Sequence, residues 1–129
     1  LDTTSPTPSG FALFVSGGKL TLKLGSSLLQ SPPNSFTYNT WQHVAVTVQG
    51  TVATFKTTFY INGVQSGGPI FTPPVSVNNT QDLLIGFSRL NSGCPSCEVT
   101  LDEIEIFDDV LSSADILAIY KAGHTGKCP

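Results

Sequence analysis

The sequence predicts an all-β fold, an antiparallel β-sandwich of the jelly-roll type that ends in one short helix. Short apolar runs alternate with polar residues at a two-residue period, and glycine and proline turns separate them. A helical period occurs once, near the C-terminus. With 129 residues, of which 40% are hydrophobic, residues 1–129 suit a single domain with one core.

A strand followed by a helix is predicted near the C-terminus, and we expect the other elements to be arranged around it. Residues 98–107 alternate as a strand does, and two aspartates end the run. Ser112 can then cap a helix with Asp115 as its capping-box partner, and Gly123 suits the residue that closes it. The helix should therefore pack against the rim of the sandwich.

Hairpin turns organise the earlier part of the chain. Gly17-Gly18 and Asn62-Gly63 are turn dipeptides between alternating runs, so each predicts a hairpin. In the strand that begins at Trp41, the valine side should face the core. Residues 69–80 are interpreted as a proline-rich connection. The strands expected before the final one are 11–16, 19–24, 41–48, 55–61, the short return at 64–65, and a buried strand at 83–87.

Composition excludes two classes of partner. Charged residues make up only 12% of the chain, against about 25% in an average globular protein, and the net charge is −3. Nucleic acid is excluded as a partner because phosphate contacts require clustered basic residues. Membrane insertion is excluded because no apolar run approaches the roughly 18 residues of a spanning helix, and the first ten residues do not resemble a signal peptide.

Three cysteines indicate an oxidising compartment. Cys94 and Cys97 stand two residues apart in a loop, and Cys128 lies beside the C-terminus. Zinc is disfavoured because the histidines that would complete four ligands lie on a predicted strand and in the tail. We expect either a Cys94–Cys97 disulfide or a bond from one of that pair to Cys128, with one thiol left for a partner or free.

Five motifs occur in the order and spacing of laminin G-like domains, and the sequence most resembles the bacterial concanavalin A-like jelly rolls related to laminin G and pentraxin modules. The resemblance covers roughly residues 10–122. It implies two curved antiparallel sheets, secretion or cell-surface display, and a binding role within a multidomain protein. The motifs are Trp41-Gln42-His43-Val44-Ala45-Val46-Thr47, Phe59-Tyr60-Ile61-Asn62-Gly63-Val64, Leu84-Ile85-Gly86, Leu101-Asp102-Glu103-Ile104-Glu105-Ile106-Phe107, and Leu111-Ser112-Ser113-Ala114-Asp115-Ile116 with Ile119-Tyr120.

The resemblance also indicates missing strands. Family domains usually begin with further strands before the segment that matches Gly10 to Phe14 here. An unpaired sheet edge and an uncovered core face are costly and prone to association. We therefore expect another chain, a second copy or a partner fragment to supply strands, unless the fold has adapted to their absence.

The resemblance raises the possibilities of calcium binding and of catalysis. Related jelly rolls of the glucanase type bind calcium through an aspartate on the last strand, which Asp102 matches, although partner oxygens would come from the missing strands. Glu103 and Glu105 would lie about 7 Å apart on one face of that strand, where a glucanase pair is possible. Their order, Glu103-Ile-Glu105-Ile-Phe-Asp108, departs from the glucanase Glu-x-Asp-x-x-Glu pattern, and a solvated strand face is the preferred interpretation.

We therefore predict a non-catalytic extracellular module that binds glycans or protein partners. Candidate stacking residues are Trp41, Tyr38 and Phe36, although packing is the preferred role for Trp41. The first alternative is a structural subunit of an extracellular assembly joined through exposed strands or cysteines. The second is a glucanase-like glycoside hydrolase.

Overall fold

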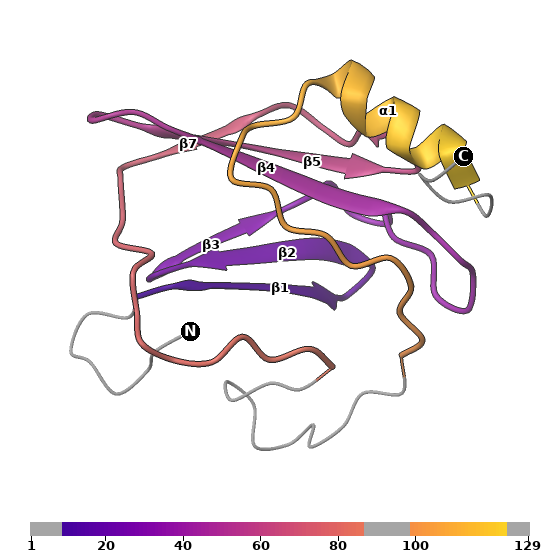
Figure 1. The fold of residues 1–129 in the computed structure, drawn as a ribbon, viewed down its shortest axis with the longest axis horizontal. Helices are drawn as coiled ribbons and strands as arrows, with labels where there is room; N and C mark the ends of the chain where they lie inside the picture. Colours follow the sequence, from indigo (N-terminus) through magenta and orange to yellow (C-terminus); the bar gives the residue numbers. More distant parts are fainter. Residues whose placement is uncertain (1–8, 87–98, 124–129) are drawn as a thin grey trace.

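The structure is a computed structural model that describes residues 9–86 and 99–123 of the 129-residue chain. Its described strands form two antiparallel sheets, and one helix lies across the second sheet (Figure 1). This all-β sandwich with a C-terminal helix confirms the predicted fold class. The elements are β1 (Phe11–Ser16), β2 (Lys19–Leu24), β3 (Ser27–Gln30), β4 (Val44–Gly50), β5 (Phe55–Ile61), β6 (Val64–Gln65), β7 (Ile70–Thr72) and α1 (Ser113–Ala122).

The first sheet has the strand order β1-β2-β3. Its first hairpin forms as predicted, because Gly17 and Gly18 adopt φ values of 58° and 69° and so close a two-residue turn with Ser16 opposite Lys19. The leucines of β2 point into the sandwich and are almost fully buried. The core cluster consists of Leu20, Leu22, Leu24, Leu29 and Phe59.

The second sheet is built on the long pair of β4 and β5, with β6 and β7 both paired to β5. The predicted hairpin at Asn62-Gly63 is confirmed, since these residues have φ values of 51° and 75°. The valine side of β4 faces the core, also as predicted, and Val44, Val46 and Val48 pack against the core cluster. The side chains that alternate with them face the opposite side of the sheet.

Helix α1 begins where the sequence predicts. Ser112 is its N-cap, and a complete capping box joins Ser112 to Asp115. Ile116 is the buried anchor of the helix. The backbone N–H of Gly123 donates to the Tyr120 carbonyl and closes the C-terminal end. Among the described residues, no helix is long and apolar enough to cross a membrane.

Two short strands were not predicted from the sequence. β3 follows β2 through a tight turn at Gly25, which has a φ of 53°, and it adds Leu29 to the core. β7 lies inside the segment interpreted as a proline-rich connection and pairs with the start of β5. Both strands are short and flanked by turn residues. They form because a neighbouring strand pairs with them, and their own residue pattern is too short to predict this.

Two predicted strands were wrong over the part that the structure describes. Residues 83–86 and 99–107 belong to neither sheet, and all of them are exposed. Glu103 adopts a φ of 49°, a left-handed conformation that interrupts the expected alternation. The final strand is therefore not the element around which the sheets are arranged. A segment becomes a strand only when its backbone pairs with an adjacent strand. An apolar, alternating pattern does not by itself determine that pairing.

Candidate functional site

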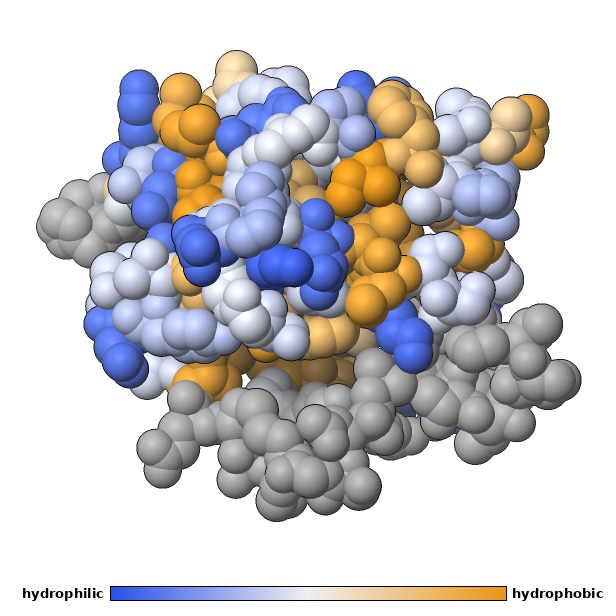
Figure 2. Space-filling model, turned by 180° about the vertical axis from the view of Figure 1, so that it is seen from behind, coloured by the Kyte–Doolittle hydropathy of each residue, from blue (hydrophilic) through white to orange (hydrophobic). Residues whose placement is uncertain are grey.

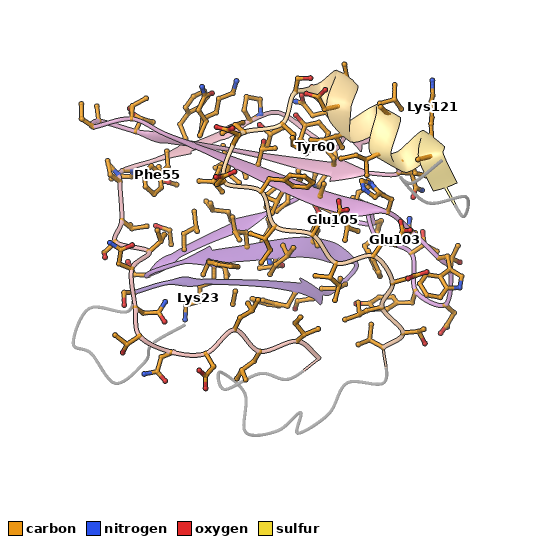
Figure 3. The ribbon with its side chains drawn as sticks, viewed as in Figure 1. Lys23, Phe55, Tyr60, Glu103, Glu105 and Lys121 are labelled. Atoms are coloured by element: carbon orange, nitrogen blue, oxygen red, sulfur yellow. The ribbon has the colours of Figure 1, made fainter. Side chains whose placement is uncertain are left out.

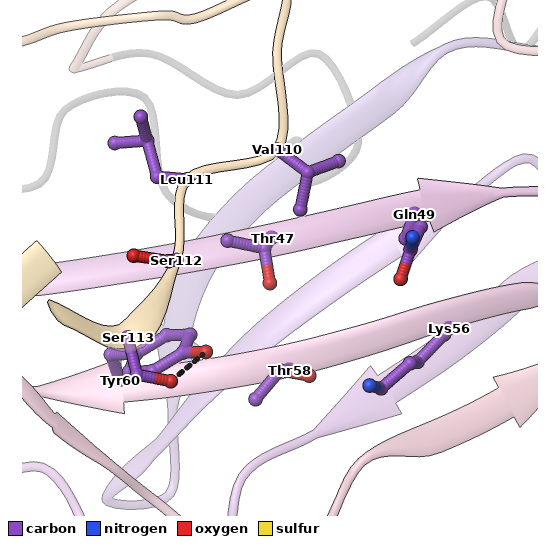
Figure 4. Close-up of a pocket in the computed structure, with 9 residues that line it drawn as sticks. All are labelled: Thr47, Gln49, Lys56, Thr58, Tyr60, Val110, Leu111, Ser112 and Ser113. Atoms are coloured by element: carbon purple, nitrogen blue, oxygen red, sulfur yellow. Dashed lines mark hydrogen bonds between the residues drawn. The ribbon is translucent and has the colours of Figure 1, made fainter. Parts of the chain in front are cut away.

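A pocket of about 320 Å³ lies on the outer face of the second sheet (Figure 4). Its floor comes from directly opposed residues of β4 and β5, with Gln49 across from Lys56 and Thr47 across from Thr58. These side chains face away from the core because they alternate with the inward-facing valines of β4 and with Phe59 of β5. The polar half of each strand thus forms the floor.

The wall of the pocket comes from the segment that enters α1. Val110, Leu111, Ser112 and Ser113 pass over the sheet on their way into the helix. The Tyr60 hydroxyl lies 3.2 Å from Ser113 Oγ, and either group can be the donor. This hydrogen bond joins β5 to the first residue of the helix, residues 53 positions apart, and fixes the separation between the floor and the wall.

Most of the groups that line the pocket are neutral and polar, and one is positively charged. Five hydroxyls line it, together with one amide and one ammonium group, while two aliphatic side chains supply apolar contact. Hydroxyls and amides both donate and accept hydrogen bonds, and Lys56 adds a positive charge at neutral pH. No carboxylate is among the described lining residues. Such a surface suits a ligand that is rich in hydroxyl groups, and it offers no grouping for acid–base hydrolysis by two carboxylates.

Sequence reasoning did not identify this pocket. The alternation in the strand that begins at Trp41 correctly assigned its valine side to the core, and no role was predicted for its opposite side or for either side of residues 55–61. The available signal was the recurrence of threonine on the outward side of both strands, at Thr47 and Thr58. Only the fold brings residues 110–113 over that face.

The three predicted stacking residues lie outside the pocket. Phe36 and Tyr38 contact each other edge to face, with ring centroids 5.6 Å apart and an interplanar angle of 77°. The Tyr38 hydroxyl accepts a hydrogen bond of 3.2 Å from the Gly18 backbone N–H. Both residues therefore belong to a loop that is anchored on the first hairpin.

Trp41 follows in the same loop, and the preference for a packing role was wrong. The side chain is 68% exposed, and Tyr38 is 56% exposed. β4 begins only at Val44, three residues later than expected. Trp41 therefore lies in the loop before the strand and lacks the burial that was expected for a residue within it. The loop presents Tyr38 and Trp41 to solvent, while Phe36 is half-buried.

The loss of the final strand also affects the predicted metal and catalytic residues. Asp102 lies on an exposed segment outside both sheets, and the described residues contain no group of three histidine, cysteine or acidic side chains that could hold a metal ion. Glu103 and Glu105 lie on the same segment (Figure 3). The argument that placed them on one face of a strand no longer applies, because Glu103 is in the left-handed region. Cys94, Cys97 and Cys128 lie outside the described residues.

Comparison with known families decides the classification. Residues 3–117 match the sequence model of laminin G-type domains in the concanavalin A-like lectin/glucanase superfamily. The chain belongs to this superfamily. The resemblance drawn from the five motifs is thereby confirmed, although one of them, at residues 101–107, does not form the expected strand.

One solved structure of similar fold is the S-layer domain-containing protein (residues 221–444) from Clostridium thermocellum, at 24% identity and a TM-score of 0.51. The superposition covers 93% of this superfamily domain and 59% of that chain. Our chain thus spans a little under two thirds of the length of its structural relative. No curated protein matches the sequence.

Proposed function

We propose that this superfamily domain is a non-catalytic extracellular module that binds glycans in the pocket between β5 and the entrance to α1. The observation that supports the proposal is the lining of five hydroxyls and one amide around a volume of about 320 Å³, which is at the small end of the usual range for ligand pockets. Sugars are recognised by groups that can donate and accept hydrogen bonds together. Val110 and Leu111 offer the apolar surface against which a ring can rest.

Lys56 favours an acidic saccharide over a neutral one. It is exposed, stands at one end of the pocket floor, and carries the one positive charge among the described lining residues. A carboxylate on the ligand would gain a charge-assisted hydrogen bond there and would meet no opposing carboxylate. The proposed ligand is therefore a saccharide that contains a uronic or similar acid.

An extracellular location is supported by the superfamily assignment and by the low charge of the chain. A surface rich in hydroxyl and amide groups suits contact with saccharides. Calcium could support the same role through Asp102 if residues outside the described part supply further oxygen ligands, because a calcium ion takes six to eight of them.

The test is binding of saccharide libraries that contain matched neutral and uronic-acid oligosaccharides, followed by titration calorimetry on the hits. Thr58→Val should weaken binding of all hits about tenfold, since it removes a hydroxyl and preserves the shape of the side chain. Lys56→Gln should weaken the acidic hits alone. Lys23→Gln is the matched control, because it removes the same charge from a strand of the other sheet.

Three further experiments test the binding site, the calcium requirement and the absence of catalysis. If Trp41→Ala abolishes binding while Thr58→Val does not, the exposed aromatic loop is the binding site instead of the pocket. Loss of binding in EDTA and in Asp102→Asn would establish the calcium requirement. Turnover of a β-glucan that Glu103→Gln abolishes would contradict the non-catalytic assignment, and an absence of saccharide hits would contradict the proposal as a whole.

A further inference from the structure

The pocket has a second feature that favours negative charge, at the end away from Lys56. Helix α1 begins there, with Ser112 as its N-cap and Ser113 as its first residue, and both residues line the pocket. The helix leaves the pocket on the side away from Lys56, so the N–H groups of its first turn point back toward the pocket (Figure 4). The N-terminus of a helix carries a partial positive charge, and this end of the pocket therefore favours an anion.

Two N–H groups of the first turn have no acceptor. The capping box satisfies the other two, because Asp115 Oδ2 accepts from the Ser112 N–H at 3.0 Å and Ser112 Oγ accepts from the Asp115 N–H at 3.2 Å. Bonding within the helix begins with the Ile116 N–H, whose nitrogen lies 3.1 Å from the Ser112 carbonyl oxygen. The N–H groups of Ser113 and Ala114 donate to no group among the described residues, and they remain available to a ligand.

Thr58 independently indicates that the pocket receives a polar ligand. Its side chain is only 6% exposed, yet its hydroxyl has no hydrogen-bond partner in the described part of the chain. Figure 4 shows Thr58 on the pocket floor between Lys56 and the hydrogen bond that joins Tyr60 to Ser113. A buried hydroxyl that bonds to no protein group can both donate to a ligand and accept from it.

The nearby carboxylates do not line the pocket. Asp109 precedes the wall segment, and Asp115 is held by Ser112, but neither side chain is among the described lining residues. Asp115 offsets part of the positive charge of the helix end, so the attraction for an anion is weaker than at an uncapped helix. The two groups that attract an anion from within the pocket are thus Lys56 and the first turn of α1.

Positive charge at both ends distinguishes the pocket from the rest of the described surface, whereas apolar contact does not. Apolar side chains also gather on the face of the molecule opposite to that of Figure 1 (Figure 2). Lys56 and Tyr60 are four residues apart on β5, which corresponds to about 13 Å along the strand. Tyr60 in turn bonds to Ser113 at the helix end. A single sugar ring is shorter than this span, so two acid groups at the two ends belong to different sugar units.

We propose that the pocket binds a saccharide with two acid groups, one at Lys56 and one at the N–H groups of Ser113 and Ala114. The Thr58 hydroxyl bonds to the part of the ligand between them. This inference rests on the glycan binding proposed above, and it narrows the ligand to an oligosaccharide that carries uronic acids on more than one unit.

The probes are three oligosaccharides of equal length that contain no, one and two uronic acids. Each is titrated calorimetrically against the 129-residue protein. The ligand with two acids should bind about fivefold more tightly than the ligand with one, which is the size of effect expected for a negative charge at a helix N-terminus. In NMR spectra, the ligand with two acids should shift the amide signals of Ser113 and Ala114 more than the neutral ligand does.

Ser113→Pro tests the helix end directly, because it removes one of the two N–H donors. Proline is favoured at the first helical position and requires an extended residue before it, which Ser112 is, with a φ of −72° and a ψ of 162°. This variant should remove most of the fivefold gain from the second acid. Ser113→Ala is the matched control, since it loses the same hydroxyl but retains the N–H, and it should keep the gain. If circular dichroism shows that Ser113→Pro is unfolded, the amide shifts of the parent protein decide the question.

Three results would overturn the inference. The first is equal affinity for the ligands with one and two acids, and the second is a folded Ser113→Pro variant that keeps the full gain. Amide signals of Ser113 and Ala114 that respond equally to the neutral and the doubly acidic ligand are the third. In each case, binding that Thr58→Val weakens would leave the proposed function standing. Failure of all three oligosaccharides to bind would overturn the proposed function together with this inference.

Discussion

Gly63 lies directly against Tyr120 of α1, and the contact leaves no room for a side chain. A Cβ built on Gly63 would stand 2.9 Å from the Cβ and Cδ1 atoms of Tyr120 and 3.0 Å from Cδ1 of Leu117. Gly63 also has a φ of +75°, where side chains are disfavoured. The turn between β5 and β6 is thus the surface on which the helix rests.

Gly63→Ala should therefore destabilise the fold by about 2 to 4 kcal/mol, the sum of backbone strain and overlap with the helix. Denaturation by urea measures the change. Gly17→Ala is the control that separates the two causes, because Gly17 has a φ of +58° and nothing within 4 Å of the added Cβ. It should cost about 1 kcal/mol from strain alone. Equal losses in the two variants would show that the helix contact contributes nothing.

Adjacent leucines in β3 should differ sharply in their contribution to stability. Leu29 is 4% exposed and belongs to the core cluster, whereas Leu28 is 58% exposed on the other side of the strand. Leu29→Ala should cost about 2 to 5 kcal/mol through lost burial and the cavity left behind, and Leu28→Ala less than about 1 kcal/mol. Similar midpoints of urea unfolding for the two variants would contradict the assignment of β3 to the core.

Thr57 places a hydroxyl in the core side of β5, and its Oγ1 atom has no hydrogen-bond partner among the described residues. Burying such a group costs free energy, so Thr57→Val should stabilise the protein by about 1 kcal/mol. The neighbouring Thr58 faces the pocket instead. Thr58→Val is the matched control and should bring no comparable gain. Thermal unfolding of the pair distinguishes them, and a loss of stability in Thr57→Val would indicate a hidden partner for its hydroxyl.

The capping box of α1 should give the protein a specific response to acid. The Asp115 carboxylate accepts hydrogen bonds from the Ser112 hydroxyl at 2.6 Å and from the Ser112 N–H at 3.0 Å. These bonds hold the pKa of Asp115 below its ordinary value of 3.8, with the side-chain bond as the larger cause, against a small opposing effect of burial. Folding therefore favours the ionised form.

The stabilisation from Asp115 should be complete above pH 3.8 and should be lost as the pH falls through the lowered pKa. The Asp115→Asn variant should accordingly lose less stability than the parent protein in that acid range. Asp109→Asn removes a carboxylate outside the cap and is the control. In Ser112→Ala, NMR titration should show the pKa of Asp115 moving up toward 3.8, and an unchanged pKa would contradict the role of the cap.

Local signals determined the parts of this protein that depend on neighbouring residues. The glycine pair at 17–18, Asn62-Gly63 and the Ser112–Asp115 box each specify a turn or a cap through backbone conformation, and each formed where the sequence predicted it. Alternation in β2 and β4 likewise determined which side of each strand is apolar and faces the core. The superfamily could be identified from the same motifs.

Only the tertiary structure determined that the pocket forms and that two apolar segments lie outside both sheets. Thr58 and Ser113 share a pocket because the chain entering α1 crosses the outer face of the second sheet, and no short-range pattern encodes that crossing. Residues 83–86 and 99–107 have the composition of strands but lie in neither sheet. A strand exists only when its backbone groups find a neighbour, so its formation is a property of the assembled sheet.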